Sequence, residues 1–226
     1  MKRKLERCQK LILQTDPFSL ESMVRSVLIH YFYHVSDKQI VEVANDDPRG
    51  PKSVNLLSPT VFKGRGRIRL TASTILGVVQ SPGAYACSYI EARTENSVIE
   101  IGEDTTINNR ATIISEGAGI RIGRRCLIGP ELMITDSNNH ELEIGRRNLA
   151  DQKPQQVVIG DDVFIGFRVT ILKGCRVGNG CVIAAGCVVP PSFEAPPMSV
   201  IAGNPARIVA TLVENMSNGF DFPPRL

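Results

Sequence analysis

The chain has 226 residues, of which 42% are hydrophobic and 22% charged, and these proportions are typical of a globular protein rather than a disordered one. The formal net charge is +3, but the first ten residues carry five basic side chains and one acidic one, so the remainder is nearly neutral. A duplex-binding protein needs a basic face along its fold, so no nucleic-acid partner is expected. No apolar run reaches the roughly 20 residues of a membrane span, and none near the start suits a secretory signal, so a cytoplasmic protein is expected.

Residues 1–52 are predicted to form an N-terminal helical region that ends in a linker. Residues 1–13 fit a short basic helix, and 17–35 carry apolar residues at the i, i+3, i+4 spacing of an amphipathic helix, with Pro17 in its first turn. The basic segment has two interpretations. It is either a solvated helix face or a weak peripheral contact with the inner face of an anionic membrane, because its charge is too small to anchor the protein by itself.

A second short helix is predicted over 36–44, because Ser36 and Gln39 have capping-box spacing. Residues 45–51 have the composition of a linker. Residues 53–95 are predicted to form irregular first β coils, from the β-rich segments 68–70, 75–79 and 89–92.

A six-residue repeat dominates the rest of the chain. Branched aliphatic residues recur six apart, the next residue is often glycine, and the residue two positions earlier is small and apolar. The aliphatic series is Ile101, Ile107, Ile113, then Ile122, Ile128, Ile134, and then Ile159, Ile165, Ile171, Val177, Ile183, Val189 and Ile201. This period is neither that of a helix nor that of a single strand. It predicts short strands joined by tight corners, stacked as coils around an inner apolar stripe.

The cysteines fit the same pattern. The sequence has six, without a CxxC pair, and four of them occupy the small apolar position of the repeat: Cys126, Cys175, Cys181 and Cys187. We therefore interpret these four as packing residues rather than metal ligands or redox groups.

The repeat resembles that of the hexapeptide-repeat acyltransferases. The stretch Val157-Val-Ile-Gly-Asp-Asp-Val-Phe-Ile-Gly is similar to the family's C-terminal coils, and Val200-Ile-Ala-Gly-Asn-Pro-Ala-Arg-Ile208 to its closing segment. The resemblance implies a mainly β fold, a left-handed parallel β-helix, with the acetyltransferase core over 96–210 and a tail over 211–226. Within the family, the branch that acetylates sugar and polysaccharide hydroxyls is the most similar.

The repeat stops after Ile134 and resumes at Val157, so residues 136–156 are predicted to form an excursion loop. The loop contains His140, the one histidine outside the N-terminal helix. By resemblance, His140 is the catalytic base that takes the proton of a sugar hydroxyl as it attacks acetyl-CoA. Asp136 is the second catalytic candidate, because it either orients His140 or binds sugar hydroxyls, unless it is a plain coil-end turn.

Two asparagines are candidate acceptor-binding residues. Asn108 matches the family asparagine that holds the sugar, although a corner residue that satisfies its own backbone would look the same. Asn139 lies beside the proposed base, where an ordinary turn residue is the alternative.

The resemblance also supplies the acetyl-CoA groove. Gly166 and Phe167 match the segment whose backbone N–H meets the thioester region, and Ala185 matches the alanine along the pantetheine arm. Arg207 matches a basic residue near the CoA phosphates. Two phosphate-reading side chains of the family are replaced, by Pro190-Pro191 and by Ala210, and Lys173 or the pair of Arg168 and Arg176 is proposed to compensate. The family implies a homotrimer with active sites between subunits, and no metal.

Other functions remain as alternatives. A γ-type carbonic anhydrase has this fold but needs several histidines around zinc, and only His140 lies in the coils. A xenobiotic (antibiotic) acetyltransferase is the chief rival among enzymes, and a non-catalytic β-helix scaffold is the rival from another class. The sequence thus predicts an acetyl-CoA-dependent O-acetyltransferase that acts on a capsular or O-antigen type of polysaccharide, or on its precursor.

Overall fold

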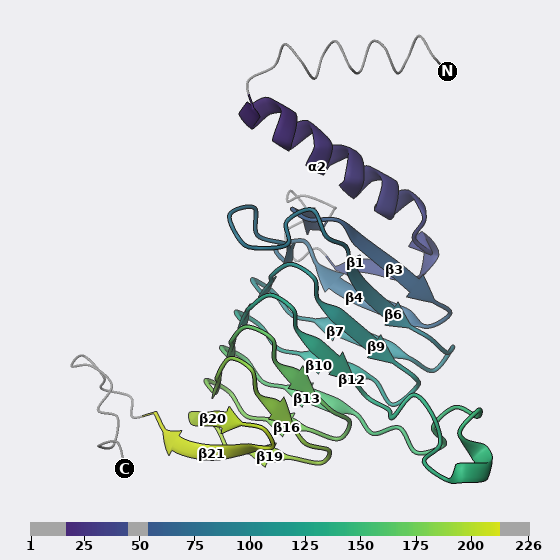
Figure 1. Ribbon diagram of the computed structural model, residues 1–226, viewed down its shortest axis with the longest axis vertical. Coiled ribbons are helices and arrows are strands. Elements are labelled where there is room, and N and C mark those ends of the chain that lie inside the picture. The colour runs from purple at the N-terminus through teal and green to yellow at the C-terminus, as the bar shows by residue number, and fades with distance from the viewer. Residues whose placement is uncertain (1–16, 45–53, 213–226) are drawn as a thin grey trace.

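Figure 1 shows a computed structural model of the protein, which describes residues 17–44 and 54–212. The predicted basic helix at 1–13, its membrane contact and the predicted linker at 45–51 lie outside the described residues. So does nearly all of the predicted tail at 211–226. The division of the chain into regions at residues 52, 95 and 210 therefore stays a prediction.

The chain winds through three parallel sheets that form the faces of a prism, the left-handed parallel β-helix that the sequence predicted (Figure 1). Each coil contributes one strand to sheet A, then one to sheet B and one to sheet C. Sheet A contains β1 (Val41–Ala44), β4 (Arg67–Thr71), β7 (Val98–Ile101), β10 (Ile120–Ile122), β13 (Val157–Ile159), β16 (Arg176–Val177) and β19 (Glu194–Ala195). Sheet B contains β2 (Asn55–Leu56), β5 (Ile75–Leu76), β8 (Thr106–Ile107), β11 (Leu127–Ile128), β14 (Phe164–Ile165), β17 (Val182–Ile183), β20 (Ser199–Gly203) and β21 (Ala206–Thr211). Sheet C contains β3 (Thr60–Gly64), β6 (Ser88–Ala92), β9 (Thr112–Ser115), β12 (Met133–Thr135), β15 (Thr170–Ile171) and β18 (Val188–Val189).

The residues before the prism form α2 (Pro17–His34), as predicted, and a 3-10 turn, η1 (Lys38–Ile40). The predicted second helix over 36–44 is wrong, because β1 pairs in parallel with β4 and adds a strand to sheet A. The Ser36 hydroxyl caps no new helix. It donates to the Phe32 carbonyl (2.9 Å) and accepts from the Phe62 amide (3.0 Å), which ties the end of α2 to β3. The β-branched residues that follow then favour an extended backbone.

The six-residue repeat fills the interior of the prism. On sheet C, Ile113, Ile134 and Ile171 lie in one register across three coils and are fully buried. The small residues two positions before the repeat aliphatics are buried as well, including Cys126, Cys175, Cys181 and Cys187. These four cysteines belong to the hydrophobic core, as expected of packing residues, and none forms a disulfide in the described part of the chain. Burial raises the pKa of each thiol, to about 11 for Cys175.

The corners show why glycine follows so many of the aliphatic residues. A Cβ on Gly129 would lie 2.7 Å from the carbonyl carbon of Gly166 in the next coil, so the coils stack this closely only without a side chain there. Other corner residues adopt positive φ and pair with the next coil. Glu131 (φ 61°) accepts hydrogen bonds from Arg110 (3.0 Å) and Arg168 (2.7 Å), which forms a charged ladder along one edge.

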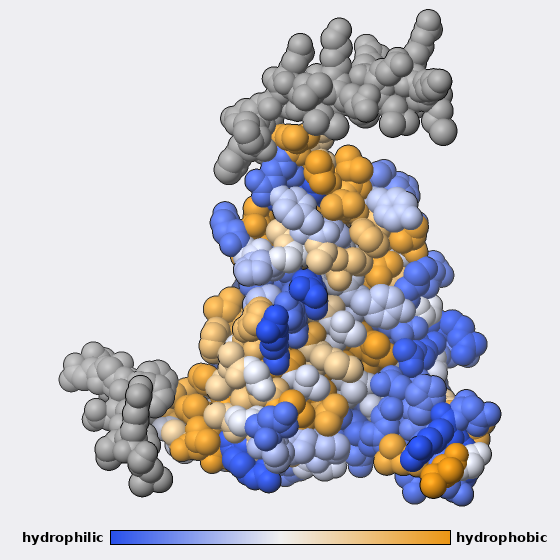
Figure 2. Space-filling model, viewed as in Figure 1, coloured by the Kyte–Doolittle hydropathy of each residue, from blue (hydrophilic) through white to orange (hydrophobic). Residues whose placement is uncertain are grey.

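At each end of the prism an additional element covers a strand of one sheet. α2 contacts β3 at one end, and β21 folds back antiparallel on β20 at the other. The outer side of α2 leaves apolar side chains exposed, Val27 and Tyr31 among them, and apolar residues gather at this end in Figure 2. In the part of the chain that the structure describes, no helix is long and apolar enough to cross a membrane.

Candidate active site

The predicted excursion is a loop that leaves the prism after β12 and returns at β13, with a 3-10 turn, η2 (Ile144–Arg146), on the way. It projects at the lower right of Figure 1, from the edge where sheet C passes into sheet A, which we name the C/A edge. The Gln155 amide donates to the Asp136 carbonyl (2.7 Å) and closes the base of the loop. His140 lies near the start of the loop, and its side chain is exposed.

Asp136 is fully buried at the point where the loop leaves the coil. Its carboxylate accepts three hydrogen bonds of 2.7 Å, from the Ser115 hydroxyl and from the amides of Glu116 and Gly119. All three donors belong to the preceding coil, and none of these bonds goes to His140. In this structure Asp136 therefore holds the corner of the coil beneath the loop.

Asn139, directly before His140, has the left-handed backbone conformation (φ 60°) that asparagine tolerates better than most residues. Its amide donates to the Ser137 hydroxyl (3.0 Å), and its side-chain oxygen accepts a long hydrogen bond from Arg93 Nη1 (3.4 Å). These contacts form the turn that immediately precedes the exposed His140.

Arg93 is the centre of a charged cluster that the sequence reasoning missed. It pairs with Glu91 (2.9 Å) and Glu116 (2.6 Å), and its hydrogen bond with Glu91 contributes most to raising the pKa of its guanidinium. Glu116 Oε2 is buried without a hydrogen-bond partner among the described residues. Arg93 and Glu116 directly follow Ala92 and Ser115, which pair in register between neighbouring coils. Aligning the coils in the sequence would therefore have indicated that the two side chains are neighbours.

A second ion pair was also missed. Lys173 Nζ lies 2.6 Å from Asp151 Oδ2, and both side chains are nearly buried. Burial by itself would raise the pKa of Asp151, but hydrogen bonds from the Asn138 amide, from Lys173 and from the Lys153 amide hold it below its ordinary value. Lys173, which is predicted to compensate for missing CoA-binding side chains, is only 11% exposed and pairs with Asp151, so that role stays a prediction.

The predicted CoA-binding residues lie at a different edge, where sheet B passes into sheet C, which we name the B/C edge. Gly166 packs so closely on the next coil that a Cβ there would lie 2.6 Å from the Ala185 nitrogen. Ala185 is exposed, and a Cβ on the following Gly186 would meet no atom within 4 Å. No acceptor for the Phe167 N–H is found among the described residues. The backbone is thus accessible along this edge.

Asn108 occupies the same corner slot as Gly166, two coils earlier, and is half-buried. Its Oδ1 accepts from the Asn109 amide (2.7 Å), which is the local contact expected of a corner residue. The structure therefore places Asn108 on the B/C edge with the predicted CoA-binding residues.

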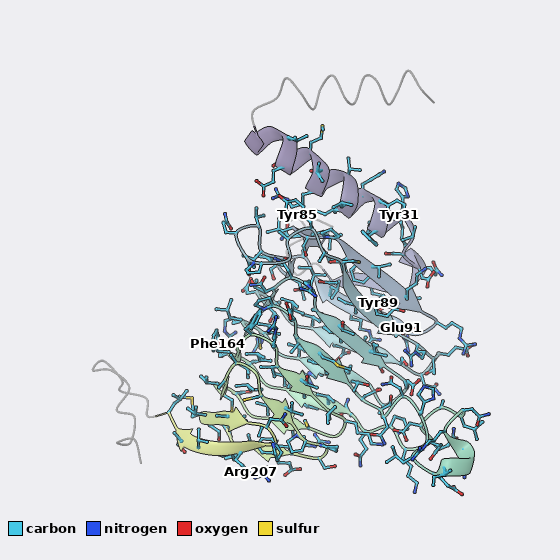
Figure 3. All side chains as sticks on the ribbon, in the orientation of Figure 1. Tyr31, Tyr85, Tyr89, Glu91, Phe164 and Arg207 are labelled. Carbon is cyan, nitrogen blue, oxygen red and sulfur yellow. The ribbon has the colours of Figure 1, made fainter. Side chains whose placement is uncertain are left out.

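Arg207 lies on β21 opposite Ala202 and is exposed at the C-terminal end of the prism (Figure 3). Its Nη1 donates to the Ala206 carbonyl (2.8 Å). Arg168, on the B/C edge, already pairs with Glu131 and stacks on the Phe167 ring, and Arg176 lies on the outer face of sheet A.

Each chain thus separates the predicted site residues into two groups. Asp136, Asn139 and His140 lie at the C/A edge, whereas Asn108, Gly166, Phe167 and Ala185 lie at the B/C edge. Figure 3 shows Phe164, on the strand before Phe167, on the left of the prism, opposite the excursion loop. Over residues 17–44 and 54–212 no group of three or more histidine, cysteine or acidic side chains could hold a metal ion.

Comparisons with known proteins agree with this architecture. Residues 156–191 match the family model described as bacterial transferase hexapeptide (six repeats). The chain is 29% identical to a candidate acetyltransferase of Saccharomyces cerevisiae, YJL218W, over 88% of this chain and 95% of that protein. It is 35% identical to a candidate lipopolysaccharide-biosynthesis O-acetyltransferase of Escherichia coli K12, WbbJ, over 50% of this chain and 60% of that protein.

Among solved structures, the polysialic acid O-acetyltransferase OatWY is 26% identical and superposes with a TM-score of 0.52, over 73% of each chain. The match to the repeat model, the similarity along most of the chain and the shared coils all point to the same group of proteins. Residues 156–191 thus carry the repeat of the bacterial hexapeptide transferases, and the coils are similar to those of OatWY.

Proposed function

We propose that the protein is an O-acetyltransferase that moves the acetyl group of acetyl-CoA to a sugar hydroxyl, with His140 as the general base. The observation that carries the proposal is the place of His140, an exposed imidazole on the long loop between β12 and β13. The other two histidines, His30 and His34, lie in α2 at the end of the prism. The names of the relatives support a carbohydrate acceptor of the polysaccharide class.

The chemistry needs one base and an oriented thioester. The neutral imidazole takes the proton of the acceptor hydroxyl as its oxygen attacks the thioester carbonyl carbon. The tetrahedral intermediate then collapses, the C–S bond breaks, and the CoA thiolate takes the proton from the imidazolium. The products are the O-acetylated sugar and CoA, and no acyl-enzyme is needed. The Phe167 N–H is the proposed donor to the oxyanion.

The B/C edge fits an extended pantetheine arm. Ala185 and Gly186 are exposed there, beside the tightly packed Gly166. An extended chain with amide groups can bind such an edge by hydrogen bonds to exposed backbone groups. Arg207 is the proposed contact for the CoA phosphates, because its guanidinium is exposed and forms no ion pair with any described residue. Asn108 and Asn139 are the proposed contacts for the sugar.

The active site is proposed to form between copies of the chain, because one chain holds His140 and Phe167 at different edges. The outer faces of the sheets support this arrangement. The outer face of sheet A carries a row of charged residues interrupted only by Val158, whereas sheets B and C expose apolar side chains such as Leu127, Phe164 and Met133. Packing sheet B of one copy on sheet C of the next would close a ring, for which we propose a homotrimer.

The apolar tip of the excursion loop supports the same assembly. Leu142 and Ile144 are 71% and 83% exposed, on the loop that carries His140. Exposed apolar groups of this size are typical of a surface that contacts another chain. A neighbouring copy that covers them would also bring its B/C edge toward His140.

The test is CoA release by the purified protein with a panel of neutral, amino and acidic glycans and hydroxylated antibiotics, with mass spectrometry of the acetylated product. His140→Ala is expected to lower turnover by about 10²–10⁴ and to leave the fold intact. His34→Ala is the matched control, because this exposed histidine lies far from the loop, and it should keep the parent rate. Near-parent turnover of His140→Ala would refute the role of the base.

A further inference from the structure

The excursion loop has little apolar anchorage of its own. Residues 142–150 are exposed throughout, and the hydrophobic side chains among them point away from the core. Asp151 is the exception, with a side chain that is only 5% exposed. A catalytic base on such a loop needs some other device to hold it in place, because productive geometry requires precision of about 0.5 Å.

The Asp151 carboxylate joins the two limbs of the loop. Its Oδ2 accepts from the Asn138 amide (2.8 Å) on the outgoing limb, two residues before His140. Its Oδ1 accepts from the Lys153 amide (3.0 Å) on the returning limb. One side chain therefore fixes both limbs by hydrogen bonds of good length.

Lys173 ties this bridge to the body of the prism. It follows β15, in the coil after the loop, and its Nζ donates to Asp151 Oδ2 (2.6 Å) and to the Lys153 carbonyl (2.9 Å). Its side chain is 11% exposed, so both charges of the pair are largely removed from water. Burying two charges is costly, and an apolar pair would anchor a loop as firmly. What the ion pair adds is direction, since hydrogen bonds fix the orientation of the Asn138 peptide and apolar contacts do not.

A second contact holds the same limb from the opposite side. Arg93 and Glu116, in the coils before the loop, reach Asn139 through the Arg93 guanidinium. The segment from Asn138 to His140 is thus held between the preceding coils and the following one.

We propose that Asp151, held by Lys173, is a positioning residue that orients the Asn138–His140 segment for proton transfer. The inference rests on the proposed function of His140 as the base. Asp151 touches neither substrate in this arrangement and acts through the peptide of Asn138.

Two double variants distinguish a loss of kcat caused by lost positioning from one caused by lost charge or lost stability. Asp151→Leu with Lys173→Met removes both charges and the acceptor for the Asn138 amide. Asp151→Asn with Lys173→Gln removes the same charges but keeps an acceptor at that place. The first is expected to lower kcat about 10–100-fold with an unchanged KM for acetyl-CoA, because small displacements of a catalytic group cost this much. The second should stay within about threefold of the parent kcat. Thermal unfolding of both is measured in parallel.

Equal kcat values of the two double variants, whether both high or both low, would overturn the proposal. Hydrogen exchange of the parent protein provides a second measurement that needs neither variant to fold. The Asn138 amide should be protected like the amides of the coils, and Lys173→Met should remove that protection. An unprotected Asn138 amide in the parent would also overturn the proposal. Absence of CoA release by the parent with every acceptor would instead refute the proposed function. The exchange result would still show whether Asp151 and Lys173 hold the Asn138 peptide.

Discussion

His140 and Phe167 lie at two different edges of the same prism. His140 follows β12 of sheet C, so its loop leaves at the C/A edge, whereas Phe167 joins β14 of sheet B to β15 of sheet C. The parallel register fixes this separation, because each coil returns to the same three corners. We therefore propose that a reaction that needs both residues uses groups from two chains.

Mixing two inactive variants should consequently restore activity. His140→Ala removes the base, and Ala185→Glu adds bulk and negative charge to the exposed CoA edge without touching the core. In statistically mixed trimers, about a quarter of the sites would combine an intact His140 from one chain with an intact edge from the next. The measurement is CoA release after co-expression of the two variants, with two differently tagged copies purified in sequence.

The control for this mixing is the double variant His140→Ala/Ala185→Glu co-expressed with His140→Ala, which should stay inactive in every combination. If co-expressed single variants stay as inactive as this control, the two groups do not meet between chains.

The repeat was sufficient to predict the coils, because an inward aliphatic residue at every sixth position leaves little freedom in how the backbone turns. Ile122, Ile128 and Ile134 take up the three inner faces of one coil in the predicted order. The segment 36–44 was misjudged for a physical reason. Its helix-capping spacing is local, whereas its real partners are β4 and the Phe62 amide, more than twenty residues away.

The candidate site was harder to predict than the coils. His140 was proposed because it lies in the loop that interrupts the repeat and because the family resemblance places the base there. Asp151 and Lys173 are 22 residues apart and belong to no repeat pattern, so the sequence did not indicate that they pair. Lys173 looks like a surface cation in the sequence, and only the stacking of the loop on the next coil buries it. The Arg93–Glu116 pair was missed for the same reason, since it depends on the register between coils.

The stability of the prism is expected to reside in its inward residues. Ile122 is 1% exposed, and its neighbour Arg121 points outward from sheet A. Ile122→Ala should lower the free energy of unfolding by about 2–5 kcal/mol, because it leaves a cavity in a close-packed stripe. Arg121→Ala is the matched neighbour and should stay within about 0.5 kcal/mol of the parent. Urea unfolding followed by circular dichroism compares the two, and equal losses would contradict the assignment of the core.

The buried cysteines should be unreactive in the folded protein. Burial raises the pKa of Cys126, Cys175, Cys181 and Cys187, and the thiolate is the form that alkylates. Iodoacetamide at pH 8, followed by peptide mass spectrometry, should leave these four unmodified while half-buried Cys87 reacts slowly. In urea all five should react, which controls for detection. Rapid labelling of Cys175 in the native protein would show that the interior of the coils opens.

The charged ladder at the B/C edge should make the thermal stability of the protein depend on pH in the acid range. The hydrogen bond from Arg168 lowers the pKa of Glu131 below its ordinary value of 4.5, and Arg110 acts in the same direction. A carboxyl group whose pKa is lower in the folded state stabilises the fold above its unfolded value, and this contribution is lost as the pH falls through the folded value. Glu131→Gln should therefore lower the Tm at pH 7, and the difference from the parent should shrink below pH 4.5. Glu95→Gln, at an exposed position in an earlier coil, should show no such convergence. A Glu131→Gln difference that stays constant from pH 7 to pH 3 would mean that the ladder stabilises the corner by packing rather than by charge.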